Sequence, residues 1–216
     1  MKDYANALWA VVALFFIAAS TATAQAPPTH PDPTAVLIGS FTVTISVNGG
    51  AVSFSRFGAT MSSAATENCQ VTAGATVWRT STGQIDYIID PASIQFSGDC
   101  GSADLTPSEI FGQLAAAAIA RGIQLEFSSC NPDCSAQQHS RVYSALCVRQ
   151  VGSGNQTQYI ACDMTSMCYR EYIYCCPNGI DAPEVTEVPR EGEGCGPGDN
   201  GPCQPTCGPR SPWVID

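Results

Sequence analysis

Cysteine is the residue type whose number and spacing point most directly to chemistry in this chain. The chain holds 12 cysteines in 216 residues, and three of them fall in the segment CYREYIYCCPNG, residues 168–179. Cysteine thiolates bind metals or exchange disulfides, whereas paired half-cystines join distant parts of a chain. These uses need different spacings and different compartments, so the sequence can separate them.

Zinc binding and redox catalysis both fit the spacing poorly. Cys130, Cys134 and His139 form a C-x3-C-x4-H pattern to which Cys147 would add a fourth ligand, but the paired CxxC arrays of structural zinc sites are absent. Redox pairs usually have C-x-x-C at the start of a helix, and the chain contains no C-x-x-C. We therefore predict structural disulfides with no metal site and no cofactor, and keep a Cys/His metal-binding protein as an alternative.

The N-terminus indicates export to a compartment in which disulfides persist. Lys2 is followed by an apolar run, residues 7–19, and by an A-x-A cleavage pattern at 22–24. A run of this length is typical of a secretory signal peptide and is shorter than the ~18 residues of a membrane span. We predict a signal peptide at 1–24 and a secreted or cell-surface protein, beginning at Gln25, with no membrane segment after cleavage.

In an oxidising compartment all the cysteines are expected to pair. Two pairs follow from position: the first-half cysteines should join each other, and a hairpin with its turn at 154–155 would place the residues at 147 and 162 opposite each other, within disulfide reach. The first predicted pair is Cys69–Cys100, and the second is Cys147–Cys162. The other predicted half-cystines are Cys130, Cys134, Cys168, Cys175, Cys176, Cys195, Cys203 and Cys207.

The last cysteines of the chain should be tied to the body. Cys175 and Cys176 point to opposite faces of a strand and must therefore have different partners. Nine cysteines lie before residue 177 and three after it, so complete pairing within the chain requires at least one bridge between the two parts. We expect Cys175 or Cys176 to make that bridge, because the C-terminal segment begins beside them.

Residues for catalysis are few. After Lys2 the chain has no lysine, and its two histidines are His30, in a proline-rich stretch, and His139, in a polar Cys-rich loop. No G-x-S-x-G, H-E-x-x-H or phosphate-binding loop is present. An extracellular hydrolase would have to use His139 as its base, and we interpret the acid pair Asp86 and Asp90 as solvent-facing.

Apolar alternation predicts a mainly antiparallel sheet. The run LIGSFTVTISV, residues 37–47, alternates apolar with serine and threonine side chains, and the following Asn48-Gly49 is a type I′ turn signal that sets Ile45 opposite Val52. The sequence predicts further strands at 70–72, 76–80, 84–89, 93–96, 123–127, 141–150, 157–164 and 168–176, the last three as a meander.

One helix is predicted, in TPSEIFGQLAAAAIARG at 106–122. Thr106 is its N-cap, Pro107 takes the first helical position, Glu109 completes a capping box and Gly122 ends it. Its buried stripe consists of Ile110, Phe111, Leu114, Ala118 and Ile119.

Together these elements predict an α+β fold, mainly antiparallel sheet with one packed helix, stapled by disulfides. A proline-rich spacer at 25–34 precedes this domain at 35–176, and an irregular, acidic tail rich in Cys, Pro and Gly follows at 177–216. Strand tyrosines suggest a binding face, because tyrosine combines contact area with a polar tip. They are Tyr143, Tyr159, Tyr169, Tyr172 and Tyr174.

The net charge and the small number of potential catalytic residues indicate the functional class. The net charge of −10 excludes nucleic acid as a partner. We predict a secreted, non-enzymatic structural or binding module whose partner is an extracellular protein or a glycan. Asn155 begins an N-Q-T glycosylation sequon, which is used only if the protein is made in a eukaryote.

Overall fold

The structure is a computed structural model that describes residues 28–48, 51–53, 69–100, 106–163, 165–188, 195 and 203–207. The predicted signal peptide, 1–24, lies outside the described residues. Within them, no helix has both the length and the apolar character needed to cross a membrane.

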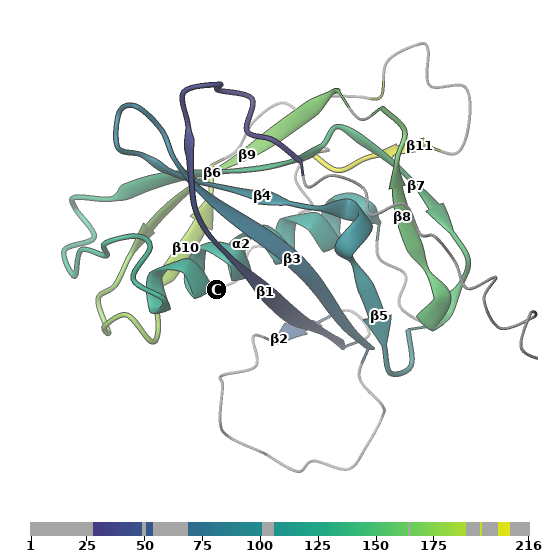
Figure 1. The fold of residues 1–216 in the computed structure, drawn as a ribbon. Helices are drawn as coiled ribbons and strands as arrows, with labels where there is room; N and C mark the ends of the chain where they lie inside the picture. The colour runs from purple at the N-terminus through teal and green to yellow at the C-terminus, as the bar shows by residue number, and fades with distance from the viewer. Residues whose placement is uncertain are drawn as a thin grey trace, which may run out of the picture.

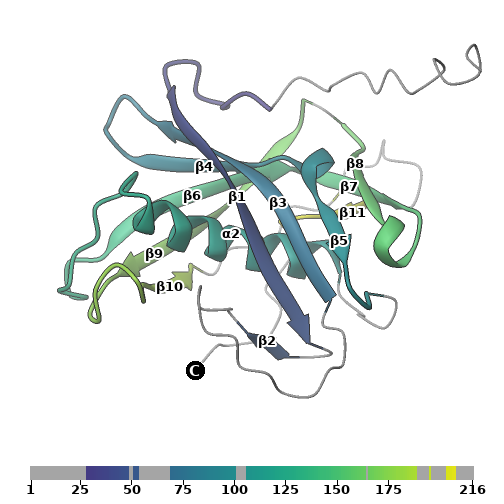
Figure 2. The same cartoon turned by 60° about the horizontal axis from the view of Figure 1, so that its bottom comes forward.

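The largest element is a mixed sheet in which all strand pairs but one are antiparallel (Figure 1). Its order is β10-β9-β6-β4-β3-β1-β2, with β5 paired to β3, and the parallel pair is β4 with β6. The helix α2 lies along one face of this sheet, as Figure 2 shows, so the predicted α+β class is confirmed. The strands are β1 (Val36–Asn48), β2 (Ala51–Ser53), β3 (Cys69–Arg79), β4 (Ile85–Ile89), β5 (Gln95–Ser97), β6 (Gln138–Ala145), β9 (Met167–Cys175) and β10 (Glu184–Glu187).

The predicted first hairpin forms, but in a different register. Val47 rather than Ile45 pairs with Val52, and Asn48 pairs with Ala51. Gly49-Gly50 meets the same turn requirement as Asn48-Gly49, so the sequence did not distinguish the two registers. The main partner of β1 is β3, where Ile45 lies opposite Val71 and both side chains are buried.

The helix α2 (Pro107–Gln124) begins as predicted and ends later. The Thr106 side chain accepts from the Glu109 amide and the Glu109 side chain accepts from the Thr106 amide, so the capping box is confirmed. All five predicted stripe residues are buried. The helix continues through Gly122 to Gln124, and Ile123 extends the buried stripe, so the predicted stop at Gly122 and the predicted strand at 123–127 are both wrong.

Gly122 serves close packing rather than helix termination. A Cβ atom at this position would lie 2.2 Å from the hydroxyl oxygen and 2.6 Å from a ring carbon of Tyr87. Tyr87 is fully buried in β4 and its hydroxyl is bonded to Ser128 at 2.9 Å, so the ring cannot move aside. Glycine is therefore what allows α2 to approach β4.

We expect Gly122→Ala to lower the free energy of unfolding by about 2 kcal/mol. Alanine is favoured over glycine inside a helix by about 1 kcal/mol, but forcing a methyl group into a packed core costs more than that. The comparison variant is Gly112→Ala in the same helix, where the nearest atom to the new Cβ is 3.3 Å away, and this variant should lose less. Urea unfolding measures both, and a Gly122→Ala protein as stable as the wild type would contradict this account of the packing.

The predicted meander is wrong in its pairing. β6 pairs with β9, while the strands between them, β7 (Cys147–Val151) and β8 (Gln158–Ala161), leave the large sheet and form a second one with β11 (Cys203–Pro205). Period-two alternation is the same in either sheet, and sequence neighbours pair by default, which is why the sequence suggested a meander. The small sheet, ordered β11-β7-β8, lies close to β5 in Figure 1.

The β7–β8 hairpin keeps its predicted register and not its predicted turn. Val148 lies opposite Ala161, as a turn centred on 154–155 requires. Pairing stops at Val151 and Gln158, however, and the connection contains the 3-10 turn η2 (Gly154–Gln156), so the loop is longer than two residues. Asn155 is exposed on this turn.

Six disulfides use all 12 cysteines. The predicted Cys69–Cys100 pair is confirmed. The predicted Cys147–Cys162 pair is wrong: the two residues are neighbours, since the Cys162 amide donates to the Cys147 carbonyl at 3.0 Å, but each sulfur bonds to the tail instead. The backbone hydrogen bond marks the pair type that strains a cross-strand disulfide, and tail cysteines offer other partners. The remaining bridges are Cys130–Cys176, Cys134–Cys175, Cys147–Cys195, Cys162–Cys203 and Cys168–Cys207.

The tail is held against the body, as the odd cysteine counts predicted. All three tail cysteines bridge to residues before 177. Cys175 and Cys176 have different partners, as expected, but neither joins the tail, so that part of the prediction is wrong. The segment 177–216 also supplies β10 to the edge of the large sheet and β11 to the small one.

Candidate functional site

The predicted face of five tyrosines is divided by the fold. Tyr172 and Tyr174 point to the helix side of the large sheet and are buried, and Tyr159 is buried in the small sheet. Only Tyr143 and Tyr169 lie on the face of the large sheet that α2 does not cover. They are opposed residues of β6 and β9, with ring centroids 5.4 Å apart.

The face of the large sheet that α2 does not cover carries an aromatic cluster, which we define as Trp78, Tyr143, Tyr169, Arg141 and His30. The Arg141 guanidinium carbon lies 5.1 Å from the centre of the Tyr169 ring, within cation–π range. The His30 ring lies 4.9 Å from Tyr143 and 5.8 Å from Trp78. The cluster is thus a continuous row of rings across β3, β6 and β9, and Trp78, Arg141 and Tyr169 remain partly exposed.

His30 also belongs to a buried histidine–aspartate pair. His30 Nε2 is 3.2 Å from Asp86 Oδ2, and the two side chains are 1% and 0% exposed. The prediction that Asp86 faces solvent is therefore wrong, and His30 is part of the fold rather than of a free spacer. No local pattern in the sequence indicates this pair, because 56 residues separate the partners.

Both ring nitrogens of His30 have hydrogen-bond partners. The Asp32 amide donates to Nδ1 at 3.0 Å, and Nε2 faces Asp86 Oδ2. Asp86 Oδ1 accepts from the Arg141 amide at 3.2 Å. Within the described residues no hydroxyl or thiol is bonded to either ring nitrogen, so the arrangement fastens residues 28–34 to the sheet and does not activate a nucleophile.

Burial raises the pKa of Asp86 above its ordinary value, an effect that exceeds the lowering by the Arg141 amide and by His30. The folded state therefore binds this proton more tightly than the unfolded state does. As pH rises from the ordinary pKa of 3.8 through the raised pKa, the contribution of Asp86 to the free energy of unfolding therefore falls.

We expect Asp86→Asn to remove this pH dependence. The substitution disturbs the bond to His30 at every pH, so the diagnostic quantity is the difference in unfolding free energy between wild type and variant. That difference should shift in favour of the variant as pH rises from about 3.5 to about 7. Urea unfolding at both pH values measures it, and a difference that stays constant would show that the Asp86 charge is not the cause.

His139 lies at the surface, on the face of the large sheet that carries the aromatic cluster. It is 56% exposed, and its Nδ1 is 3.4 Å from Glu171 Oε1. A histidine beside a carboxylate is a possible general base. Within the described residues no serine hydroxyl is bonded to His139, so the nucleophile that a hydrolase of the predicted kind requires is not in place.

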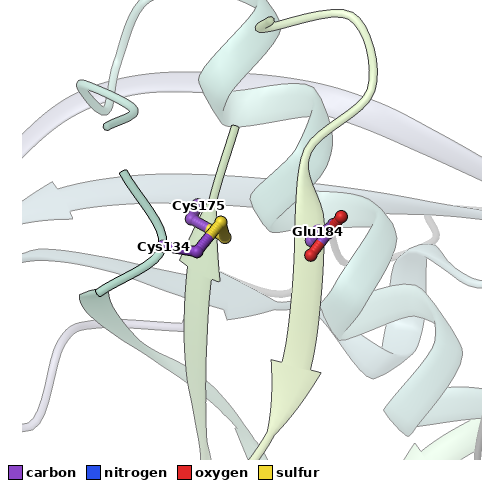
Figure 3. Close-up of side chains that lie close together, drawn as sticks. All are labelled: Cys134, Cys175 and Glu184. Carbon is purple, nitrogen blue, oxygen red and sulfur yellow. A yellow bond between two sulfur atoms is a disulfide. The ribbon is translucent and has the colours of Figure 1, made fainter. Parts of the chain in front are cut away.

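The sulfur ligands of the metal alternative are all in disulfides. Cys130, Cys134 and Cys147 would each have to supply a thiolate, and a half-cystine has none. Figure 3 shows the Cys134–Cys175 disulfide beside Glu184, a group of potential ligand atoms that lie within 4.8 Å of one another. Because two of its three members are bonded to each other, this group offers one carboxylate and no metal site.

Comparison with protein-family models, with curated proteins and with solved structures gave no match. The class that the fold defines is a disulfide-stapled α+β domain whose bridges fit an extracellular protein.

Proposed function

We propose that the protein is a secreted, non-enzymatic binding module that binds an extracellular protein or glycan through the aromatic cluster. The observation that carries this proposal is the stacking of Arg141 on Tyr169 beside Tyr143, on the face of the sheet that α2 does not cover. Tyrosine, tryptophan and arginine supply most of the binding energy at protein interfaces.

The cluster is organised before any partner arrives. Its Trp78, Arg141, Tyr143 and Tyr169 side chains project from paired strands, and the His30 ring, paired with buried Asp86, packs against the Tyr143 and Trp78 rings. Side chains held in this way lose little conformational freedom on binding, which favours affinity. Six disulfides further restrict the sheet and support a role outside the cell.

The experiment is a binding screen of purified mature protein against glycans and extracellular proteins. For any partner found, Tyr169→Ala and Arg141→Ala should each weaken binding about tenfold or more. Arg149→Ala is the matched control, because Arg149 is exposed on β7 in the small sheet and should not matter. A partner whose affinity does not change in the first two variants would refute the assignment of the binding face.

A hydrolase remains the second candidate because of the His139–Glu171 pair. The same material should therefore be tested with ester, peptide and glycoside substrates. Hydrolysis that is lost in His139→Ala would establish an enzyme and overturn the non-enzymatic proposal, whereas no turnover is the expected result.

A further inference from the structure

A pocket of about 380 Å³ lies on the helix side of the large sheet, away from the aromatic cluster. It is enclosed by the N-terminal turn of α2, by β1, β3 and β5, and by the small sheet. Its volume is in the range of small-molecule sites. The apolar floor consists of Val47, Val71, Phe96, Ile110 and Tyr159.

Tyr159 is the polar feature of this floor. Its side chain is 3% exposed and packs edge-on against Phe96, with ring centroids 5.8 Å apart, and against Phe111 at 6.0 Å. Burial raises the pKa of Tyr159 to about 12, so the phenol is neutral and keeps its proton to donate.

The hydroxyl of Tyr159 has no hydrogen-bond partner in the described part of the chain. Two other tyrosines of the core do have partners: the Tyr87 hydroxyl is bonded to Ser128 at 2.9 Å, and the Tyr172 hydroxyl donates to the Gly112 carbonyl at 3.1 Å. Tyr159 lines the pocket, so its hydroxyl is a donor that a bound molecule can use. A ligand that supplies an acceptor there would gain a hydrogen bond that the described residues do not make.

The rim indicates the chemistry of that ligand. Among the described residues it is formed by amides and hydroxyls of Thr106, Gln150, Ser153 and Gln204, and none of the described lining residues is charged. Uncharged donors and acceptors around an apolar floor suit a neutral molecule with an apolar face and hydroxyls at its edge. An ionised ligand would find no counter-charge among these described residues, which is unfavourable.

We infer that this pocket binds one residue of a neutral saccharide, with the C–H face of the sugar ring on the partly exposed Phe96 ring and a sugar oxygen accepting a hydrogen bond from the Tyr159 hydroxyl. The rim amides and hydroxyls bind the outer hydroxyls of the sugar. This site is separate from the aromatic cluster and its existence does not depend on the partner proposed there.

The test uses methyl glycosides of glucose, galactose, mannose and N-acetylglucosamine as probes, titrated into the mature protein and followed by NMR. At least one should bind at concentrations up to about 10 mM. Tyr159→Phe should weaken that binding about threefold to tenfold, the effect of losing one neutral hydrogen bond. Ser153→Trp, at the exposed rim, should block the pocket, and Tyr169→Ala in the aromatic cluster should leave the affinity unchanged.

Folding of the variants is checked in parallel. Because the Tyr159 hydroxyl has no partner, Tyr159→Phe should keep the urea midpoint of the wild type, whereas the matched variant Tyr172→Phe loses a buried hydrogen bond and should unfold earlier. Failure of all four glycosides to bind, or an affinity unaffected by Tyr159→Phe and Ser153→Trp, would overturn the inference. Benzyl alcohol is the contrasting probe, and its binding in the absence of any glycoside binding would show an apolar site and refute the saccharide assignment.

Discussion

Arg170→Met is expected to lower the free energy of unfolding by about 3 kcal/mol. Arg170 is 7% exposed on the helix side of β9. Its Nη1 donates to Glu187 Oε1 at 2.6 Å, and its Nη2 donates to the carbonyls of Ser108 and Thr206, both at 2.8 Å. One guanidinium therefore joins β9 to the start of α2, to β10 and to the residue that follows β11.

Methionine would fill most of the volume and leave four oxygens without their donor, since the Ser108 hydroxyl also accepts from Nη2. The expected loss of unfolding free energy is at the low end of the range for a broken buried ion pair, because Glu187 is 27% exposed and water can solvate its carboxylate. Urea unfolding measures the change. Arg149→Met is the control: Arg149 is an exposed arginine of the small sheet, and its substitution should change stability by less than about 0.5 kcal/mol. Equal effects in the two variants would show that the Arg170 contacts contribute nothing specific.

Local patterns in the sequence predicted the elements of this fold well. The capping box at Thr106 and the helix stripe depend on residues within a few positions of each other, and both are confirmed. The Cys69–Cys100 pair could be predicted by elimination, since no other cysteine lies nearby in the sequence. Alternation on β9 puts Arg170 and Tyr172 on one face and Tyr169 on the other. That α2 covers the first of these faces is known only from the structure, where Arg170 and Tyr172 bond to residues of α2.

What the sequence could not provide was the order of the strands. The parallel pairing of β4 with β6 brings Tyr87 opposite Val142 and so sets Asp86 beside Arg141. Such a pairing spans the whole of α2, and a period-two pattern carries no information about which distant strand lies alongside. The aromatic cluster could therefore be predicted only as a tendency of the tyrosines, without Trp78 and His30.

The unknown order of the strands also explains why the partners of the tail cysteines were predicted wrongly. Counting cysteines showed that a bridge must reach it, because that argument needs no geometry. Choosing the partners needed the small sheet, in which β11 pairs with β7 and places Cys203 opposite Arg149. Because β7 was predicted to belong to a meander, no strand was available to pair with the tail. Cys175 or Cys176 was therefore predicted as the partner of a tail cysteine, since they are nearest in sequence, and this was wrong.

We expect removal of the Cys168–Cys207 disulfide, as Cys168→Ala with Cys207→Ala, to lower the free energy of unfolding by about 3 kcal/mol. The two residues are 39 apart in sequence, and a loop of that length alone would predict about 4 kcal/mol in the chain-entropy model. The neighbouring Cys162–Cys203 bridge already joins the same two segments. The loop that Cys168–Cys207 newly closes is therefore only roughly a dozen residues, which gives the smaller value.

This loss should not be independent of Arg170. Thr206, next to Cys207, bonds through its hydroxyl to Ser144 at 2.9 Å and through its carbonyl to Arg170. Without the disulfide, this part of the tail is held less firmly, so part of the Arg170 contribution is lost with it. The triple variant that adds Arg170→Met should then be destabilised by at least about 1 kcal/mol less than the sum of the separate effects, as urea unfolding of all four proteins would show. Additive losses would mean that the Arg170 contacts and the disulfide hold the tail independently, and that Thr206 does not connect them.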